Sequence, residues 1–210
     1  MQRDENKDGY HVLVAKDYSL FFIFDGVSSS KNAKLGVNTL IEFCDKSHEM
    51  YYQNREFHLS HLIEDMNICL LKGKSEDMHT TCCILFLPHD ENLPVKFTHL
   101  GDSRIYGIRQ NLNQYTEDHN DPVLRNMLTK CLGLKRLVTE DFYEKKMDDL
   151  SEKIFLCTDG FYNVMESDPG LFLKLFKSAD MKTIHEQIKN AIFLKNSDDA
   201  TYILISFTNT

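Results

Sequence analysis

Aspartates at the ends of apolar runs are the sequence feature that most restricts how this chain can fold. Asp25 and Asp159 each end a strand-sized apolar run and precede a glycine. Asp102 follows a third such run, and Asp198 stands just before the last one. Runs of this length, rich in aromatic and β-branched residues, are typical of β-strands. We therefore expect several strands whose ends carry carboxylates.

The rest of the pattern predicts an α+β fold with a largely antiparallel sheet system. Strands are predicted at 10–16, 19–24, 80–87, 95–100, 104–109, 153–157 and 201–207, and helices near 33–44, 59–71, 171–178 and 181–193. Residues 161–164 allow a further strand after a plain turn at Asp159. No repeat or linker divides the 210 residues, so we expect 1–210 to form a single domain.

Composition excludes several classes of protein. The 24 basic and 32 acidic side chains give a net charge of −8, which disfavours binding to nucleic acid or to an anionic membrane. No apolar run approaches the roughly 20 residues of a membrane span. The charged N-terminus does not resemble a signal peptide. The six cysteines form no CxxC pair, as expected of free thiols in a reducing compartment. These features predict a cytoplasmic protein.

Carboxylates held at several strand ends can converge on a site for hard divalent cations, which prefer oxygen ligands. A glycine after the aspartate lets the backbone carbonyl approach an ion closely. An Asp-Gly pair alone is equally typical of a turn. That alternative is weak at Asp25, where a helix is predicted to follow, and stays open at Asp159. An EF-hand around Asp8 is excluded, because Ala15 occupies the position of the essential glutamate.

Eight short motifs extend from the first residues nearly to the end of the chain. They are Arg3-Asp-Glu-Asn6-Lys7-Asp8, Phe22-Ile-Phe-Asp25-Gly26, Thr80-Thr81, Gly101-Asp102-Ser103-Arg104, Thr116-Glu-Asp118-His119, Leu128-Thr129 with Leu132-Gly133, Thr158-Asp159-Gly160 and Asp198-Asp199-Ala-Thr201. Each match is weak alone. Together and in this order they resemble the metal-dependent protein phosphatase family, protein phosphatase type 2C, in a short, bacterial-like form.

The resemblance implies a four-layer α-β-β-α sandwich, with two mainly antiparallel sheets between outer layers of helices. It also implies two Mn²⁺ or Mg²⁺ ions between the sheet edges. Asp25 would bridge the ions, and the Gly26 carbonyl would bind one of them. Asp159 and Asp198 would hold the other, and Asp8 would act through a bound water.

The resemblance further implies a phosphatase for phosphoserine or phosphothreonine in proteins. Asp102 would bind a third, looser ion, and the Arg3 guanidinium would bind the phosphate dianion through paired donors. Arg3 and Asp25 are therefore the predicted catalytic residues. Two cations lower the pKa of a bridging water, so that it attacks phosphorus directly without a phosphoenzyme.

Departures from the family pattern keep a second hypothesis open. Lys7 stands where the family usually has an acid, and Val27 where some members have a histidine. The segment between Tyr106 and Gly133 is too short for the usual flap, and we expect the strand that normally precedes Arg3 to be missing. The alternative is a catalytically inactive phosphatase-like domain that binds phosphoproteins or scaffolds a signalling complex. Such a domain has no need of crowded carboxylates, because uncompensated like charges destabilise a fold.

Overall fold

Two antiparallel β-sheets pack face to face in the computed structural model, which describes residues 5–124, 127–148, 150–177, 180–193, 195 and 198–207. In spatial order, the first sheet contains β1 (Gly9–Val14), β2 (Tyr18–Gly26), β5 (Thr80–Pro88), β6 (Lys96–Leu100) and β9 (Lys145–Lys146). The second contains β11 (Tyr202–Ser206), β10 (Lys153–Cys157), β7 (Arg104–Ile108) and β8 (Leu112–Gln114). The short strands β3 (Tyr52–Gln53) and β4 (Glu56–Phe57) form a separate hairpin.

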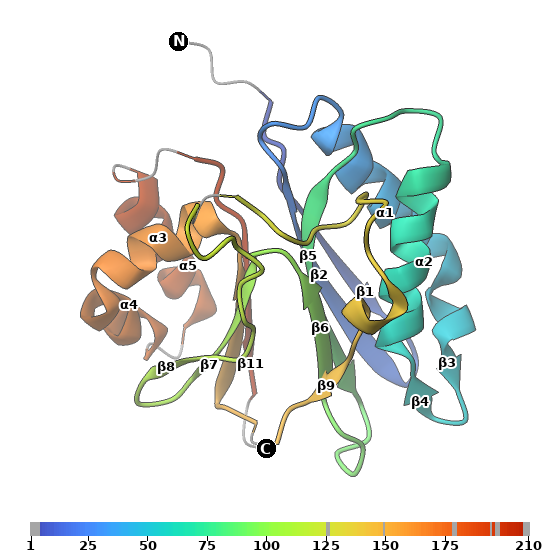
Figure 1. The fold of residues 1–210 in the computed structure, drawn as a ribbon. Coiled ribbons are helices and arrows are strands. Elements are labelled where there is room, and N and C mark those ends of the chain that lie inside the picture. Colours follow the sequence, from blue (N-terminus) through green and yellow to red (C-terminus); the bar gives the residue numbers. More distant parts are fainter. Residues whose placement is uncertain are drawn as a thin grey trace.

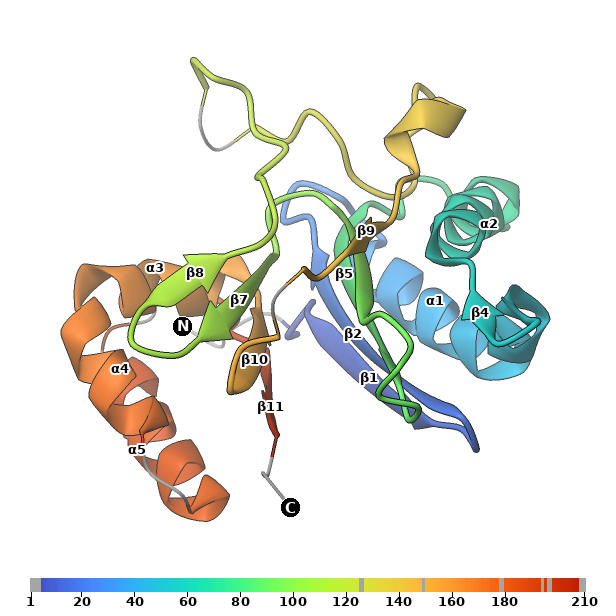
Figure 2. The ribbon, with the colours of Figure 1, turned by 90° about the horizontal axis from the view of Figure 1, so that it is seen from below.

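Helices cover the outer face of each sheet (Figures 1 and 2). Beside the first sheet lie α1 (Ala33–Ser47) and α2 (Leu59–Lys72). Beside the second lie α3 (Asp159–Ser167), α4 (Pro169–Phe176) and α5 (Met181–Phe193). Single turns of 3₁₀ helix occupy His48–Tyr51 and Thr139–Asp141. The predicted α+β class and the four-layer α-β-β-α arrangement are therefore confirmed.

Three apolar layers hold these elements together. Leu20, Phe22 and Phe24 of β2 face the helices α1 and α2. Ile23, on the opposite face of the same strand, packs between the two sheets. A third layer around Phe155 joins the second sheet to its helices. Because β2 is covered on both faces, its sequence is almost continuously apolar, as expected for a central strand.

The segment after Asp159 differs from the sequence-based expectation, because it forms the helix α3 and neither a strand nor a plain turn. Phe161 and Met165 lie one helical turn apart, and both are fully buried in the layer around Phe155. An acidic residue in the first turn also favours a helix through its dipole. Burial of this face therefore outweighs the strand propensity of Phe161-Tyr162.

The described part of the chain contains no helix with both the length and the apolar character needed to cross a bilayer. The longest helix, α1, has 15 residues. All six cysteines are unpaired, and all but the half-buried Cys69 are buried. Their role in the structure is that of small apolar side chains.

Candidate active site

The pairing of β1 with β2 places two aspartates opposite each other. Gly9 pairs with Phe24, so the antiparallel register puts Asp8 across from Asp25 at the same end of the sheet. The Asp8 side chain is nearly inaccessible, and the residue is only 5% exposed. The Asp8 amide donates to the Asn6 side chain at 2.8 Å, and the Lys34 ammonium donates to the Asp8 carbonyl at 2.8 Å. The segment before β1 is thus held in place.

A hydroxyl group joins the two sheets at this point. Thr158, between β10 and α3, donates from its Oγ1 to Oδ2 of Asp8 at 2.8 Å. Oγ1 of Thr158 also accepts a hydrogen bond from the Thr201 amide at 3.0 Å. Thr158 therefore brings three segments together: the residue before β1, the start of α3 that carries Asp159, and the loop before β11 that carries Asp198.

Gly160 is required for the approach of that last loop. A Cβ atom at this position would lie 1.9 Å from the Asp199 carbonyl oxygen, far inside van der Waals contact. The loop is further fixed by the Lys7 amide, which donates to Oδ2 of Asp199 at 2.8 Å. The Asp199 amide donates to Oδ1 of Asp198 at 2.8 Å. The glycine after Asp159 thus serves close backbone contact with the Asp198-Asp199 pair.

Asp102 reaches the same region from the turn between β6 and β7. Gly101 has φ of +105°, a backbone conformation that glycine adopts readily. The hydroxyls of Thr81 and Ser103 hydrogen bond at 2.6 Å and join this turn to β5. The Asn120 amide group donates to Oδ2 of Asp102 at 3.3 Å. The turn is therefore anchored on both sides of the aspartate.

Asp8, Asp25, Asp102 and Asp159, which we call the carboxylate cluster, perturb one another electrostatically. Burial raises the pKa of Asp25 well above its usual range, and the charges of the other three raise it further. Burial and the charge of Asp159 raise the pKa of Asp102 to about 6. Burial also raises the pKa of Asp8 to about 6, although hydrogen bonds from Thr158 and Thr201 oppose the shift. The cluster thus contains more negative charge than its surroundings neutralise.

Asp25 and Asp159 interact directly through their carboxyl groups. This interaction raises the pKa of Asp25 and acts to lower the pKa of Asp159. Burial still raises the pKa of Asp159, and the nearby charge of Asp198 adds to the effect. A divalent cation would neutralise the negative charge of this pair.

The residues fit divalent cations in their chemistry, without forming a finished coordination site. Within the described ranges, no three His, Cys, Asp or Glu side chains are arranged to hold a metal ion as they stand. All four members of the carboxylate cluster nevertheless offer oxygen, the ligand that Mg²⁺ and Mn²⁺ prefer. Binding of an ion would therefore require these side chains to adjust.

The structure places most of the predicted site residues at one end of the two sheets. Besides the carboxylate cluster, exposed Asp198 lies close enough to Asp159 to affect its pKa, and buried Gly26 ends β2. Arg3 lies outside the described residues. The ammonium of Lys7, the residue that stands where the family usually has an acid, donates to the Ser28 carbonyl at 3.0 Å.

Three residues that organise this region were not singled out from the sequence. They are Thr158, Asn120 and Asp199. Thr158 and Asp199 each lie inside one of the eight motifs, next to a predicted ligand. Their position in the sequence could therefore have indicated a role at the site. Nothing in the sequence marks Asn120.

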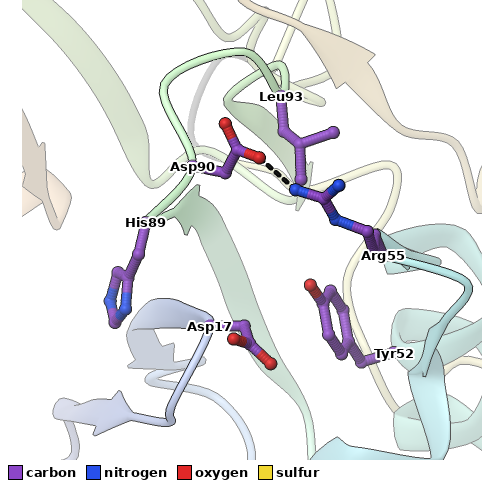
Figure 3. A pocket seen from close by; sticks show the side chains of 6 residues that line it. All are labelled: Asp17, Tyr52, Arg55, His89, Asp90 and Leu93. Atoms are coloured by element: carbon purple, nitrogen blue, oxygen red, sulfur yellow. Dashed lines mark hydrogen bonds and ion pairs between the residues drawn. The ribbon is translucent and has the colours of Figure 1, made fainter.

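A separate cavity of about 450 Å³ lies at the opposite end of β2, lined by Asp17, Tyr52, Arg55, His89, Asp90 and Leu93 (Figure 3). Arg55 and Asp90 form an ion pair across it. The His89 ring hydrogen bonds to the Ser19 hydroxyl and to the Lys16 carbonyl, both at 3.0 Å. A strand rises about 3.3 Å per residue, so this cavity is on the order of 20 Å from Asp25 and does not belong to the candidate site.

Comparison with known proteins identifies the family. The sequence profile described as Protein phosphatase 2C matches residues 2–192. The chain belongs to the protein phosphatase 2C family. This family of serine/threonine phosphatases is in general metal-dependent. A search of curated protein sequences finds no match to the chain.

Solved structures of bacterial phosphatases share the fold. Stp1 from Staphylococcus aureus has a TM-score of 0.79 at 20% identity, covering 99% of this chain and 91% of that chain. The PPM phosphatase MsPP from Mycobacterium smegmatis, in complex with cacodylate, has a TM-score of 0.77 at 16% identity, covering 98% and 94%. The S. agalactiae serine/threonine phosphatase has a TM-score of 0.72 at 18% identity, covering 100% and 96%. At these identities the likeness establishes the fold alone.

Proposed function

We propose that this member of the protein phosphatase 2C family is an active, metal-dependent phosphatase that removes phosphate from phosphoserine or phosphothreonine in proteins. The observation that carries the proposal is the carboxylate cluster, which gathers Asp8, Asp25, Asp102 and Asp159 from four separate segments. Water would attack phosphorus directly, because no cysteine or histidine nucleophile is needed when the attacking water is activated by a metal site.

The chain would hold two Mn²⁺ or Mg²⁺ ions through oxygen ligands. Asp25 would be shared between them, and the Gly26 carbonyl would bind one. Asp159 and Asp198 would bind the other, with Asp8 acting through a water molecule. When bound, such a pair of cations lowers the pKa of water and neutralises the charge on the phosphoryl oxygens.

The protein itself would position the reacting groups. The Thr158 hydroxyl holds Oδ2 of Asp8, and so fixes one carboxylate across the boundary between the sheets. The Asn120 amide group orients Asp102, which would contact a third ion. Arg3 would bind the phosphate, since a guanidinium matches a phosphate dianion with paired donors.

The electrostatics favour an active enzyme over an inactive phosphoprotein-binding domain. Burial first, and then the charges of neighbouring carboxylates, raise the pKa values of Asp8, Asp25 and Asp102, so keeping these groups ionised in the fold costs free energy. A scaffold gains nothing from that cost, whereas an enzyme recovers it when cations bind. This cost therefore supports catalysis as the role of the carboxylate cluster.

The decisive experiment compares chelator-stripped protein with and without added Mn²⁺, on p-nitrophenyl phosphate and on a phosphothreonine peptide. We expect Mn²⁺ to restore turnover in the wild type and in Asp17→Asn, whose exposed carboxylate lies at the far end of β2. Asp25→Asn should remain inactive. Phosphopeptide binding without turnover in Mn²⁺ would contradict the proposal and support the inactive domain.

A further inference from the structure

A cavity of about 560 Å³ borders the end of the first sheet that carries Asp25. Its walls come from the end of α2, the segment 73–79 and residues 133–135. Figure 1 shows the segment between α2 and β5 (green) running beside the loop that follows β2 (blue). A cavity of this volume is within the range that binds small ligands, and it can accept a few side chains of an extended peptide.

Hydrogen bonds connect the wall of this cavity to the candidate active site. Thr80 and Leu132 exchange backbone hydrogen bonds of 3.3 and 2.9 Å. The Thr80 hydroxyl also donates to the Asp25 carbonyl at 2.8 Å. One residue earlier, the His79 carbonyl accepts from the Val27 amide at 3.1 Å. The cavity and the turn after Asp25 therefore share one rigid support.

The cavity is held open by the backbone of its two walls. Asp77 has φ of +59°, a costly conformation for a residue other than glycine. Its carbonyl accepts from the Ser30 hydroxyl and from the Asn32 amide, and its carboxylate accepts from the Lys31 amide at 2.8 Å. On the other wall, a Cβ at Gly133 would lie 2.4 Å from the Met78 carbonyl oxygen. Both walls are thus fixed before any ligand arrives.

Unpaired positive charge distinguishes this cavity. Lys74 and Lys135 line it, both are exposed, and neither forms an ion pair or hydrogen bond with any described residue. Of the two acidic residues in the lining, Asp77 accepts a hydrogen bond from the Lys31 backbone amide and lies 3.5 Å from the His79 ring nitrogen, so its carboxylate already has partners within the wall. Glu76 is the remaining unpaired acid. Among the charged side chains of the lining, two ammonium groups and one carboxylate therefore have no partner in the described part of the chain.

The lining also offers an apolar surface. Leu71, 38% exposed, and the half-buried Leu134 line the cavity together with the buried Leu70. Leucine side chains left partly open to solvent beside free lysines match a ligand that is both apolar and anionic. A peptide that alternates leucine-like and carboxylate side chains has this character, whereas a lone phosphate ion would leave the apolar surface uncovered.

We propose that this cavity binds an acidic, partly apolar segment of the phosphoprotein substrate, adjacent in sequence to the phosphorylated residue. Lys74 and Lys135 contact its carboxylates, and Leu71 and Leu134 contact its apolar side chain. The inference rests on the proposed phosphatase function and names the class of substrate that it selects. Because the cavity is joined to the Asp25 turn through Thr80, a peptide seated there presents its phosphorylated residue to the carboxylate cluster.

The test uses three phosphothreonine peptides: one with a Leu-Glu-Glu flank before the phosphothreonine, one with it after, and one with Leu-Gln-Gln flanks. In Mn²⁺ we expect the kcat/KM of wild type to be about tenfold higher for one of the two Leu-Glu-Glu peptides than for the Leu-Gln-Gln peptide. Which of the two is preferred reports the direction in which the peptide lies in the cavity. The double substitution Lys74→Glu/Lys135→Glu should abolish this preference and leave turnover of p-nitrophenyl phosphate unchanged. Glu76→Gln should increase the preference, because it removes the competing carboxylate.

A matched control separates local recognition from overall charge. Lys182→Glu/Lys189→Glu makes the same change in net charge on α5, in the opposite helical layer, where both lysines are exposed. This variant should keep the preference for the acidic peptide. An equal loss in both double variants, or a parallel loss on p-nitrophenyl phosphate in Lys74→Glu/Lys135→Glu, would overturn the proposal.

Binding without turnover distinguishes failure of this inference from failure of the phosphatase function. Fluorescence anisotropy in excess chelator measures the affinity of the labelled acidic phosphopeptide, with a Leu-Gln-Gln peptide for comparison. If wild type is inactive on p-nitrophenyl phosphate, the proposed phosphatase function is wrong. The binding assay still tests whether the cavity binds the acidic peptide, because it does not depend on turnover. We expect Lys74→Glu/Lys135→Glu to weaken binding of the acidic peptide about tenfold, and equal affinities for the wild type and this variant would contradict the inference.

Discussion

Two groups of charged side chains, each with at least one buried member, follow opposite designs in this molecule. In the carboxylate cluster, like charges lie together, and burial raises the pKa of Asp25 with further increases from its neighbours. In the second group, which we call the lysine cluster, Lys96 donates to Glu56 and Glu144 at 2.8 Å each. Burial acts to lower the pKa of Lys96, but the hydrogen bonds to the two glutamates outweigh it and raise that pKa.

The lysine cluster neutralises itself and has a structural task. Oε2 of Glu144 accepts from the Leu59 and Ser60 amides at 2.8 and 3.4 Å, and so caps the N-terminus of α2. No carboxylate of the carboxylate cluster forms an ion pair with a described residue, although the charge of Arg104 acts to lower the pKa of Asp159. The difference teaches that the chain compensates buried charge where only stability is needed, and leaves it uncompensated where a cation is expected to bind.

The largest expected effect comes from removing one charge of the carboxylate cluster. Asp25→Asn should reduce kcat with Mn²⁺ at least a thousandfold, because metal activation contributes several kcal/mol to catalysis. In chelator, the same substitution should increase the free energy of unfolding by about 1–2 kcal/mol, because it removes the cost of burying an ionisable carboxyl beside other carboxylates. Phosphatase assays and urea denaturation measure both effects. Lower stability in chelator would mean that Asp25 is compensated within the fold.

Gly160→Ala should damage the same cluster through its backbone. The new Cβ would clash with the Asp199 carbonyl and displace the loop that carries Asp198. We expect a loss of about 2–3 kcal/mol in stability and a large loss of kcat. Gly170→Ala on α4 is the control, because the nearest atom to its Cβ is 3.9 Å away. Similar unfolding free energies for the two variants would contradict the close contact at Gly160.

Breaking the lysine cluster should affect stability without affecting chemistry. Lys96→Met leaves Glu144 without its cation and should lower the free energy of unfolding by about 2 kcal/mol. The loss is no larger because the Glu56 side chain is 55% exposed and stays solvated. Lys96→Met/Glu144→Gln should recover part of that loss. Urea denaturation measures the stabilities, and kcat on p-nitrophenyl phosphate should stay within twofold of wild type. A large fall in kcat at full folding would show that the two clusters are coupled.

The smallest expected effect comes from a stacked histidine pair. Its contribution to stability depends on pH in the opposite direction to that of the carboxylate cluster. The rings of His99 and His119 lie 4.8 Å apart, and burial, followed by the charge of His99, lowers the pKa of His119 from 6.5 to about 4. A lowered pKa means that the folded state binds fewer protons than the unfolded state. The stabilisation is therefore complete above pH 6.5 and is lost as the pH falls toward 4.

The comparison between wild type and His119→Gln isolates this contribution. Between pH 7.5 and pH 5 the stability advantage of wild type should shrink by about 1 kcal/mol, after allowance for solvent screening. The raised pKa values of Asp8 and Asp102 give the opposite trend, with stability falling as pH rises through about 6. Both proteins share that trend, so it cancels. A constant difference between the two curves would contradict the lowered pKa of His119.

Local sequence was sufficient for the elements whose burial follows a simple period. The run that forms β2 is almost continuously apolar, and residues 153–157 form β10 as predicted. The helix α3 was missed because Phe161-Tyr162 has the composition of a strand, and only the apolar layer around Phe155 decides its conformation. The hairpin β3–β4 was missed because its turn uses Asn54 and Arg55 with positive φ and contains no glycine to mark it.

The ligand candidates at the site were predictable, and their supports were not. Asp25 and Asp159 stand in motifs that a single sequence reveals. The hydrogen bond from Thr158 to Asp8 joins residues 150 positions apart in the sequence, so no local sequence pattern indicates it. The hydrogen bond from Asn120 to Asp102 depends in the same way on the path of a loop. Contacts of this kind are set by tertiary packing, which neither periodicity nor motif spacing encodes.

The central claim, that the carboxylate cluster binds divalent cations, is tested most directly by isothermal titration of Mn²⁺ into chelator-stripped protein. We expect wild type and Asp17→Asn to bind about two ions, each with a rise in melting temperature. Asp25→Asn/Asp159→Asn should lose this binding while remaining folded. Absence of Mn²⁺ binding in the wild type, or equal binding in the double variant, would contradict the account.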